Sequence, residues 1–447
     1  MKRLHVILLL FVTSSLLVHS CSAPYVSGDN VKAEFIHAWN GYKEFAWGHD
    51  ALRPLTRTYH DWHTESLYMT PIDAFDTMLL MGIDAEADRA KQLVLDSLSF
   101  DKDLEVQSFE ITIRLLGGLL TMYEMDGDKR FLDLAEDLGQ RLLPVFGSAT
   151  GMPYRYVHLR TGAIRDSINN PAEIGTALIE FGTLSKHTGD PVYFDKAKRA
   201  LVELYARRSS IGLVGTWINV ETGEWVNMDS HVSGAIDSYY EYLLKAWLLF
   251  GDTDCRDMFN ESMISVHRYL ADTVDGKLWY GHANMNTGER TATRFGALDA
   301  FFPAVLALSG DMDRAEALQE SAFSMWQKHG IEPEQYDYVA DTVVYAGYPL
   351  RPEIVESAYY LYKLTGKERY KEMGQEIFND LMMYCRVDAG FAHLKDVRTK
   401  EKSDAMESFF LAETMKYLYL LLGPEHALDF DAVVFNTEAH PLTRPGS

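Results

Sequence analysis

The strongest constraint on the fold is a repeat marked by glycines. Seven apolar stretches with helical periodicity end on a glycine, at positions 82, 127, 189, 251, 310, 366 and 423. From the second glycine onward the spacing is 56 to 62 residues. After each glycine except the last a second amphipathic stretch begins, often behind an aspartate that can cap it. Because glycine suits a helix C-terminus, each repeat is predicted to be a helical hairpin.

Seven hairpins could bury their apolar faces in an open solenoid or in a closed ring. The first helices, such as 111–122, are apolar over most of their circumference, whereas second helices such as 196–207 have a clear polar face. This contrast favours a closed ring with the first helices inside and the second outside. The predicted fold class is therefore all-α, an (α/α)7 barrel.

Short β-ribbons are predicted between consecutive hairpins. The segments 154–164, 217–226 and 280–294 are rich in β-prone residues and each turns at a Thr-Gly pair. Each segment precedes a first helix, so all should emerge on the same rim of the ring. We expect that rim to shape the ligand site.

Residues 1–21 are predicted to be a targeting segment. Lys2 and Arg3 precede an apolar run over 6–18 and then Cys21, a pattern similar to a bacterial lipoprotein signal. The alternative is an ordinary secretory signal cut near Ala23. Either way we expect an exported protein, in the cell envelope, the periplasm or the medium, with a lipid on Cys21 as its only membrane attachment. The remainder, 30–447, is predicted to be one catalytic domain and a monomer.

Charge and cysteine content limit the partners that the protein can bind and the way its fold can be stabilised. The formal net charge is -23 and no basic cluster is present, which excludes nucleic acid as a partner and favours a neutral one such as a sugar. Beyond residue 21 only Cys255 and Cys385 remain, so a disulfide framework is not expected.

A carboxylate recurs where each first helix is predicted to begin. These residues are Asp73, Glu110, Glu173, Asp237, Asp299, Glu353 and Glu407. Any one of them could simply favour the positive end of a helix dipole. In a closed ring, however, all would face one rim, and such crowding would be repulsive unless a cation lay among them.

The stretch 434–441, Val-Phe-Asn-Thr-Glu-Ala-His-Pro, does not have the composition of a frayed tail. We expect it to reach into the middle of the ring, where Thr437 would supply oxygens to a metal ion. Oxygen ligands select calcium or magnesium over zinc. Two carboxylates beside a neutral sugar are what glycoside hydrolysis requires.

Five stretches together resemble the class I α-mannosidases, glycoside hydrolase family 47. They are Phe-Glu at 109–110 with Arg-Leu-Leu-Gly-Gly-Leu-Leu at 114–120, Asp-Ser-Tyr-Tyr-Glu-Tyr-Leu-Leu-Lys at 237–245, Gly-Tyr-Pro-Leu-Arg-Pro-Glu-Ile-Val-Glu-Ser at 347–357, Glu-Ser-Phe-Phe-Leu-Ala-Glu-Thr at 407–414, and Phe-Asn-Thr-Glu-Ala-His-Pro at 435–441. The likeness extends from about Ala38 to Pro441. It implies a barrel plugged by a C-terminal hairpin and inverting exo-hydrolysis of terminal α-1,2-linked mannose with one Ca²⁺. The implied substrate is a high-mannose oligosaccharide or mannan.

The resemblance also implies roles for individual residues. Glu110 is similar to the general acid, with Asp237 a second candidate, Glu353 to the general base, and Thr437 to the calcium ligand. Positions similar to sugar-contacting or supporting residues are Arg114, Glu173, Glu241, Arg351, Glu356, Phe409, Glu413 and Glu438.

One motif departs from the processing enzymes of the family. They carry His-Leu-x-Cys-Phe where this chain has Ala-Leu-Asp-Ala-Phe at 297–301. In this respect the chain is more similar to the endoplasmic-reticulum degradation-enhancing α-mannosidase-like branch, and the signal indicates a bacterial member. Some proteins of that branch are regarded as glycan-binding, so a mannose-binding protein with little or no turnover is the alternative hypothesis. A helical-repeat scaffold for proteins is the third.

Overall fold

The structure is a computed structural model that describes residues 26–445. The predicted targeting segment and Cys21 lie outside the described residues. Within them, the helices are too short or too polar to cross a membrane. Cys255 and Cys385 are both buried and not disulfide-bonded.

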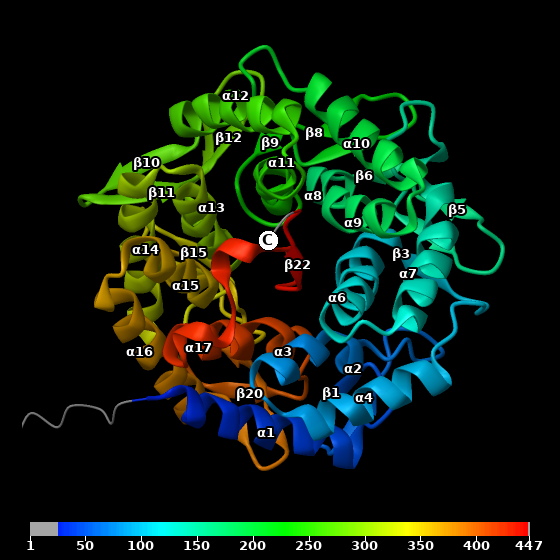
Figure 1. Cartoon of the computed structure of the whole chain (residues 1–447). Helices are drawn as coiled ribbons and strands as arrows, with labels where there is room; N and C mark the ends of the chain where they lie inside the picture. The colour runs from blue at the N-terminus through cyan, green and yellow to red at the C-terminus, as the bar shows by residue number, and fades with distance from the viewer. Residues whose placement is uncertain (1–25, 446–447) are drawn as a thin grey trace, which may run out of the picture.

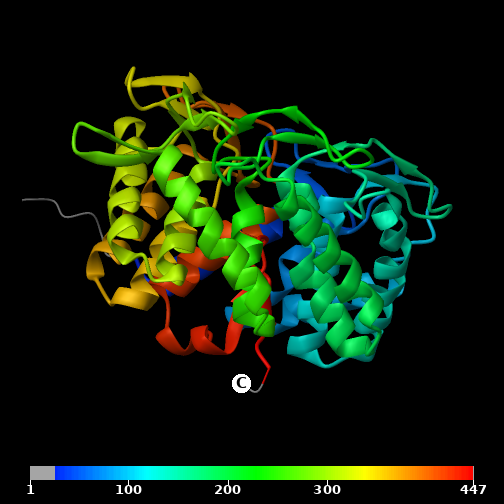
Figure 2. The same cartoon turned by 90° about the horizontal axis from the view of Figure 1, so that it is seen from above.

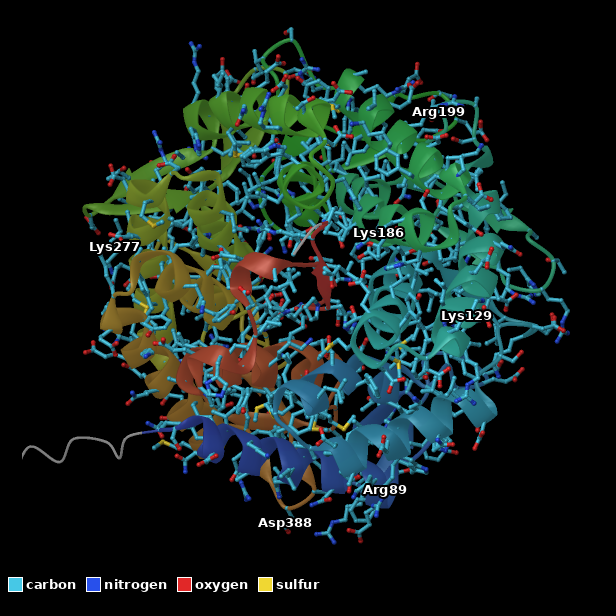
Figure 3. All side chains as sticks on the ribbon, in the orientation of Figure 1. Arg89, Lys129, Lys186, Arg199, Lys277 and Asp388 are labelled. Atoms are coloured by element: carbon cyan, nitrogen blue, oxygen red, sulfur yellow. The ribbon has the colours of Figure 1, made fainter. Side chains whose placement is uncertain are left out.

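Two concentric layers of helices form a closed ring, as Figure 1 shows. The outer helices of residues 26–445 are α1 (Gly28–Phe45), α4 (Asp84–Ser97), α7 (Lys129–Leu142), α10 (Pro191–Ala206), α12 (Thr253–Tyr269), α14 (Met312–His329) and α16 (Glu368–Tyr384). Their exposed faces carry charged side chains such as Arg89 on α4 and Lys129 on α7, which point away from the ring (Figure 3). This arrangement confirms the predicted (α/α)7 barrel.

The inner layer also has seven members within the described residues, several of them interrupted. They are α2 (Met69–Asp73) with α3 (Phe75–Leu80), α5 (Ser108–Ile111) with a π-helical turn (Thr112–Leu116) and α6 (Gly117–Asp126), α8 (Pro171–Gly175) with α9 (Leu178–Thr188), α11 (Asp237–Phe250), a 3₁₀ turn (Leu298–Phe301) with α13 (Phe302–Ser309), α15 (Glu353–Thr365), and a π-helical turn (Phe410–Thr414) with α17 (Met415–Leu422). Such interruptions are frequent at functional sites, because they re-aim side chains along a helix.

The hairpin turns follow the predicted chemistry. Gly127, Gly189, Gly251, Gly310 and Gly366 are left-handed C-caps of inner helices. The aspartates that follow the first four accept backbone N–H groups of the next outer helix, for example Val192 N to Asp190 at 3.0 Å. The last glycine stop is an exception, because Gly423 has extended backbone with φ of −95°.

The ring is closed by its first helix. The seventh inner helix, α17, has no outer partner after it in sequence, and α1 packs against it instead. On the inner layer, the π-helical turn of the seventh member contacts α2 and α3. The two ends of the described chain therefore complete one hairpin together.

Strands gather on one rim, clearly separated from the opposite ends of the helices in Figure 2. Each of four antiparallel sheets has three strands. One strand precedes an inner helix, and it pairs with the two-stranded ribbon that precedes the next inner helix. The four sheets are β3 (Glu105–Gln107), β4 (Tyr156–His158) and β5 (Ile164–Arg165); β6 (Ile168–Asn169), β7 (Trp217–Asn219) and β8 (Trp225–Asn227); β9 (Asp229–Ser230), β12 (His282–Asn284) and β13 (Arg290–Ala292); and β14 (Arg294–Phe295), β15 (Gln335–Asp337) and β16 (Thr342–Tyr345). The three predicted ribbons are confirmed as β4–β5, β7–β8 and β12–β13.

Two-stranded ribbons complete the rim: β1 (Ala51–Arg53) with β2 (Thr58–His60), β10 (Ala271–Val274) with β11 (Lys277–Tyr280), β17 (Arg386–Val387) with β18 (Gly390–Phe391), and β19 (His393–Asp396) with β20 (Glu401–Ser403). A single bridge between Leu52 and Met406 joins its first and last segments.

The C-terminal segment occupies the middle of the ring. After two 3₁₀ turns, Glu425–Ala427 and Phe430–Ala432, it forms the hairpin β21 (Val433–Phe435) and β22 (Pro441–Thr443). Figure 1 shows this hairpin inside the inner layer, and Figure 2 shows the chain end on the side opposite the strand rim. We call residues 433–443 the plug.

Candidate active site

A cavity of about 380 Å³ opens where the inner helices begin. Its wall comes from residues of inner helices, from the rim and from the tip of the plug. All twelve site residues predicted from the sequence line it: Glu110, Arg114, Glu173, Asp237, Glu241, Arg351, Glu353, Glu356, Phe409, Glu413, Thr437 and Glu438.

Three of the recurring acids have other positions. Asp73 is the last residue of α2, and Glu407 precedes the π-helical turn, so the prediction of an acid in every first helical turn is wrong for these two. Asp73 accepts from the Ser408 hydroxyl and Glu407 from the Trp62 indole N–H at 3.2 Å. Asp299 is buried and accepts from the backbone of Gly296 at 2.9 Å. These three are structural supports rather than cavity lining.

Two arginines organise the cavity. Arg114 lies in the π-helical turn after α5 and pairs with Glu110 at 2.9 Å and with Glu438 of the plug. Arg351 pairs with Glu334 at 2.7 Å and lies 3.8 Å from Glu353. Both guanidinium groups face the ring of Phe409, at 5.6 Å and 5.9 Å from its centroid. Cation–π attraction to both guanidinium groups stabilises the position of this ring.

Negative charge dominates the lining. Eight carboxyl groups and only two guanidinium groups line the cavity. Lys245 pairs with Glu241 and Arg155 with Glu173 at 2.8 Å, which neutralises two of the eight. A surplus of carboxylates remains.

Burial, with a smaller contribution from this surplus of negative charge, raises the pKa of several carboxyl groups. Burial, with the charges of Glu241 and Asp299, raises the pKa of Asp237 to about 7. Burial likewise raises the pKa of Glu353 to about 7, although Arg351 opposes the shift. For Glu413, burial and the charges of Glu353 and Glu356 raise the pKa well above its ordinary value. Carboxyl groups that titrate near neutral pH can hold or accept a proton there, as acid–base catalysis requires.

The lining fits a hard divalent cation. Among the described residues that form the wall, no histidine or cysteine is present, and the donors are carboxylate, hydroxyl and carbonyl oxygens. Thr437 lies at the tip of the plug between Glu438 and the inner helices. A calcium ion there would offset the repulsion that raises the pKa of the neighbouring carboxyl groups.

A buried network below the cavity holds Thr437 in place. The hydroxyl of Tyr242 on α11 accepts from Thr437 N at 3.2 Å and donates to Glu180 on α9 at 2.6 Å. Asn436 donates to Glu180 at 2.8 Å and to the Ile113 carbonyl at 2.9 Å. The Asn436 side-chain oxygen accepts from the backbone of Glu438 and His440. The plug tip is therefore fixed by side chains from two inner helices.

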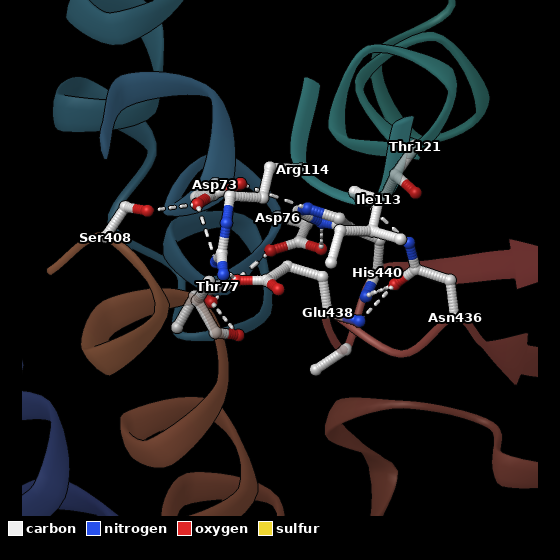
Figure 4. Close-up of polar contacts among 12 residues, drawn as sticks. Asp73, Asp76, Thr77, Ile113, Arg114, Thr121, Ser408, Asn436, Glu438 and His440 are labelled. Carbon is white, nitrogen blue, oxygen red and sulfur yellow. Dashed lines mark hydrogen bonds and ion pairs between the residues drawn. The ribbon is translucent and has the colours of Figure 1, made fainter. Parts of the chain in front are cut away.

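A second network anchors the plug to other inner helices, and Figure 4 shows Asp73, Asp76 and His440 of this network. His440 contacts Asp76 at 3.0 Å and Asp73 at 3.4 Å. Lys416 pairs with Asp76 at 2.8 Å and donates to the carbonyl of Ala439 at 2.6 Å. Burial alone would lower the pKa of His440, but the charge of Asp76 and its hydrogen bonds raise it. A positively charged His440 satisfies both aspartates.

Sequence reasoning missed these supporting residues. The signal was present in two forms, because Lys416 and Asp76 are charged residues within apolar inner stretches, and Glu180 follows Glu173 two turns later. A charged side chain in the interior is stable only when it is paired. Each of these charged residues therefore indicates a buried partner on another helix.

Strained backbone occurs beside the cavity. Ala235 has φ of 77° just before Asp237, and Ala439 has φ of 58° at the plug tip. Their carbonyls are held by the Ala172 N–H at 3.0 Å and by the Lys416 ammonium. Left-handed conformations of non-glycine residues carry strain and cluster at functional sites.

Comparisons with known proteins agree with this geometry. The family model for glycosyl hydrolase family 47 matches residues 34–444. The human ER degradation-enhancing alpha-mannosidase-like protein 2 is 39% identical, over 93% of this chain and 77% of the relative. The human endoplasmic reticulum mannosyl-oligosaccharide 1,2-alpha-mannosidase is 36% identical, over 91% of this chain and 62% of the relative.

A solved structure shows the same architecture. The alpha-1,2-mannosidase from Trichoderma reesei superimposes with a TM-score of 0.85 at 28% identity, over 93% of this chain and 98% of that one. The fold, the shared motifs and the match over nearly the whole described chain have one explanation: the protein is a glycoside hydrolase of family 47 and belongs among its α-mannosidases.

Proposed function

We propose that this protein is a calcium-dependent, inverting exo-α-1,2-mannosidase that releases terminal mannose from high-mannose glycans or mannan. The observation that carries the proposal is the meeting of Asp237, Glu353 and Thr437 in one cavity that is rich in carboxylates. Family membership supports a mannose glycan as substrate.

Two carboxyl groups would move protons. Glu353 would take a proton from the attacking water, and its unpartnered Oε2 is free to do so. The other group would protonate the departing oxygen, and two candidates line the cavity. Asp237 has the raised pKa that keeps a proton near neutral pH, whereas Glu110 accepts a hydrogen bond from Arg114. Inversion needs one acid and one base on opposite faces of the sugar.

The remaining residues would bind and orient the sugar. Phe409, which both Arg114 and Arg351 contact, would offer an apolar surface to the sugar ring. Glu356, Glu413 and Glu438 offer oxygens to sugar hydroxyls and to cation-bound water. When bound at Thr437, calcium would supply positive charge and coordination positions for hydroxyl groups.

The test is mannose release from α-1,2-mannobiose by the purified protein. We expect release in calcium, loss of release in a chelator, and recovery when calcium is restored. Proton NMR of the first product should show the β-anomer. Absence of release in calcium, with mannobiose still bound, would instead identify a glycan-binding protein.

A product profile on a nine-mannose oligosaccharide would define the substrate. Removal of only α-1,2-linked residues is expected. Release of α-1,3- or α-1,6-linked mannose as readily would contradict the proposed specificity.

A further inference from the structure

A second group of metal-ligating side chains lies on the strand rim, outside the carboxylate cavity. Asp229, His231 and His282 each place one ligand atom within 4.8 Å of those of the other two. None of the three lines the cavity described above. They were not singled out in the sequence, because 51 residues separate the two histidines.

The strand register brings these residues to one face. Strand β9 pairs with β12 so that Ala283 lies opposite Ser230 and Asn284 opposite Asp229. Continued by one residue, this register sets His282 opposite His231. Side chains two apart on a strand share a face, so Asp229 joins them there. The two imidazole rings are 4.4 Å apart, between centroids.

The hydrogen bonds fix the protonation of His231. The only hydroxyl proton of Thr216 is donated to the Asp229 carbonyl at 2.7 Å. Thr216 Oγ1 therefore accepts from His231 Nε2 at 3.3 Å, and Nε2 carries the hydrogen. In this tautomer the other nitrogen, Nδ1, carries a lone pair. It is buried, and no donor reaches it.

The neighbouring groups have the form of a metal site. His282 Nδ1 lies 2.7 Å from Asp229 Oδ2, and an ion held by both groups would replace the proton that they share. Thr291 donates to the other oxygen of Asp229. His231 is 6% exposed, and its Nδ1 is shielded from bulk solvent. An acceptor buried without a partner is costly, and a cation would satisfy it.

We propose that Asp229, His231 and His282 bind one divalent ion of the zinc class. Two imidazoles and one carboxylate match the ligand preference of zinc, and the fourth position is left for water. Calcium is disfavoured at this site because imidazole is a poor ligand for it. This site is separate from the proposed calcium position at Thr437.

The ion would join two excursions of the rim. Asp229 and His231 lie just before α11, which begins with Asp237, and His282 belongs to the hairpin that precedes the 3₁₀ turn of Asp299. Zinc binding would thus tie the segment 229–236, with its strained Ala235, to a neighbouring hairpin. Its role would be to stabilise the entrance on the side of Asp237.

The experiment uses the full chain, stripped with a chelator and dialysed, and then titrated with Zn²⁺ alone. We expect about one tight equivalent per chain by elemental analysis and calorimetry. The variants His231→Gln, His282→Gln and Asp229→Asn should each weaken binding about tenfold or more. Co²⁺ in place of Zn²⁺ should give visible absorption bands of a four-coordinate site, which the variants lose.

The matched control is His49→Gln, which removes the imidazole of another Asp–His pair, with Asp61 at 2.8 Å. It should leave zinc affinity unchanged. Circular dichroism identifies any variant that fails to fold, and Asp229→Asn, at a half-buried position, tests the site independently of the buried His231. Absence of stoichiometric zinc, or equal binding by all variants and the control, would overturn the proposal.

Discussion

Tyr242→Phe tests how the plug tip is held, because it removes one oxygen atom and preserves the ring. The hydroxyl accepts from Thr437 N at 3.2 Å and donates to Glu180 at 2.6 Å. The change leaves the Thr437 N–H without a partner in the interior and removes one of the two hydrogen bonds to Glu180 Oε1, which keeps the one from Asn436. Each such loss costs about 1–3 kcal/mol. We therefore expect unfolding free energy to fall by about 2–4 kcal/mol.

The same change should weaken calcium binding. Thr437 would no longer be fixed from below, and a loss of about 1–2 kcal/mol corresponds to a factor of roughly 5–30 in affinity and in kcat/KM. Calorimetric calcium titration and mannobiose hydrolysis measure the two quantities. Both should fall together if one ligand position is disturbed.

Tyr239→Phe is the matched control. Tyr239 is on the same helix, α11, is fully buried, and its hydroxyl has no hydrogen-bond partner. Removing it should change neither calcium affinity nor turnover by more than about twofold, since no hydrogen bond is lost. Equal effects of the two substitutions, or none from Tyr242→Phe, would refute the positioning of Thr437 by this network.

Three further predictions follow from the same geometry. Glu353→Gln should lower kcat by about 10²–10⁴-fold, because the general base is lost. The mannobiose dissociation constant should change little, because the base acts on water rather than on the bound sugar. A parallel loss of binding would indicate a structural role for Glu353. Burial raises the pKa of Glu180 from 4.5 to about 7, so the folded state binds this proton more tightly than the unfolded chain. The resulting stabilisation is complete below pH 4.5 and is lost as pH rises through about 7. The loss in unfolding free energy is about 3 kcal/mol. Denaturant unfolding at each pH should show this loss in the natural chain and not in Glu180→Gln. Gly117→Ala would place a Cβ 2.5 Å from the Asn436 amide and should displace the plug, lowering calcium affinity and melting temperature, whereas Gly147→Ala, with no atom within 4 Å of the new carbon, should have little effect.

The fold was predictable because its signals are local and repeated. Glycine stops such as Gly127 and caps such as Asp190 are set by short-range backbone chemistry, which the sequence displays directly. The position of α1 could not be predicted from the sequence. Its pairing with α17 joins the two ends of the chain, and no local pattern specifies so distant a partner.

The candidate site likewise has residues that the sequence predicts and residues that it does not. Residues within the family motifs, such as Glu353 and Thr437, were predicted as site residues and do line the cavity. Their supports were not, because Glu180 and Tyr242 act through contacts between separate hairpins. The zinc-class site shows the same limit, since its ligands meet only when β9 pairs with β12. The roles of individual residues, the domain limits and the destination of the protein remain predictions.

The plug has a consequence for how a cell produces this protein. Every residue that lines the cavity except Glu438 precedes Thr437 in the sequence, so a nascent chain contains these acids before the proposed cation ligand is synthesised. Termination just before that threonine would leave the helical wall residues in the sequence and remove the proposed cation ligand. The cavity is therefore completed only by residues from the final hairpin of the chain.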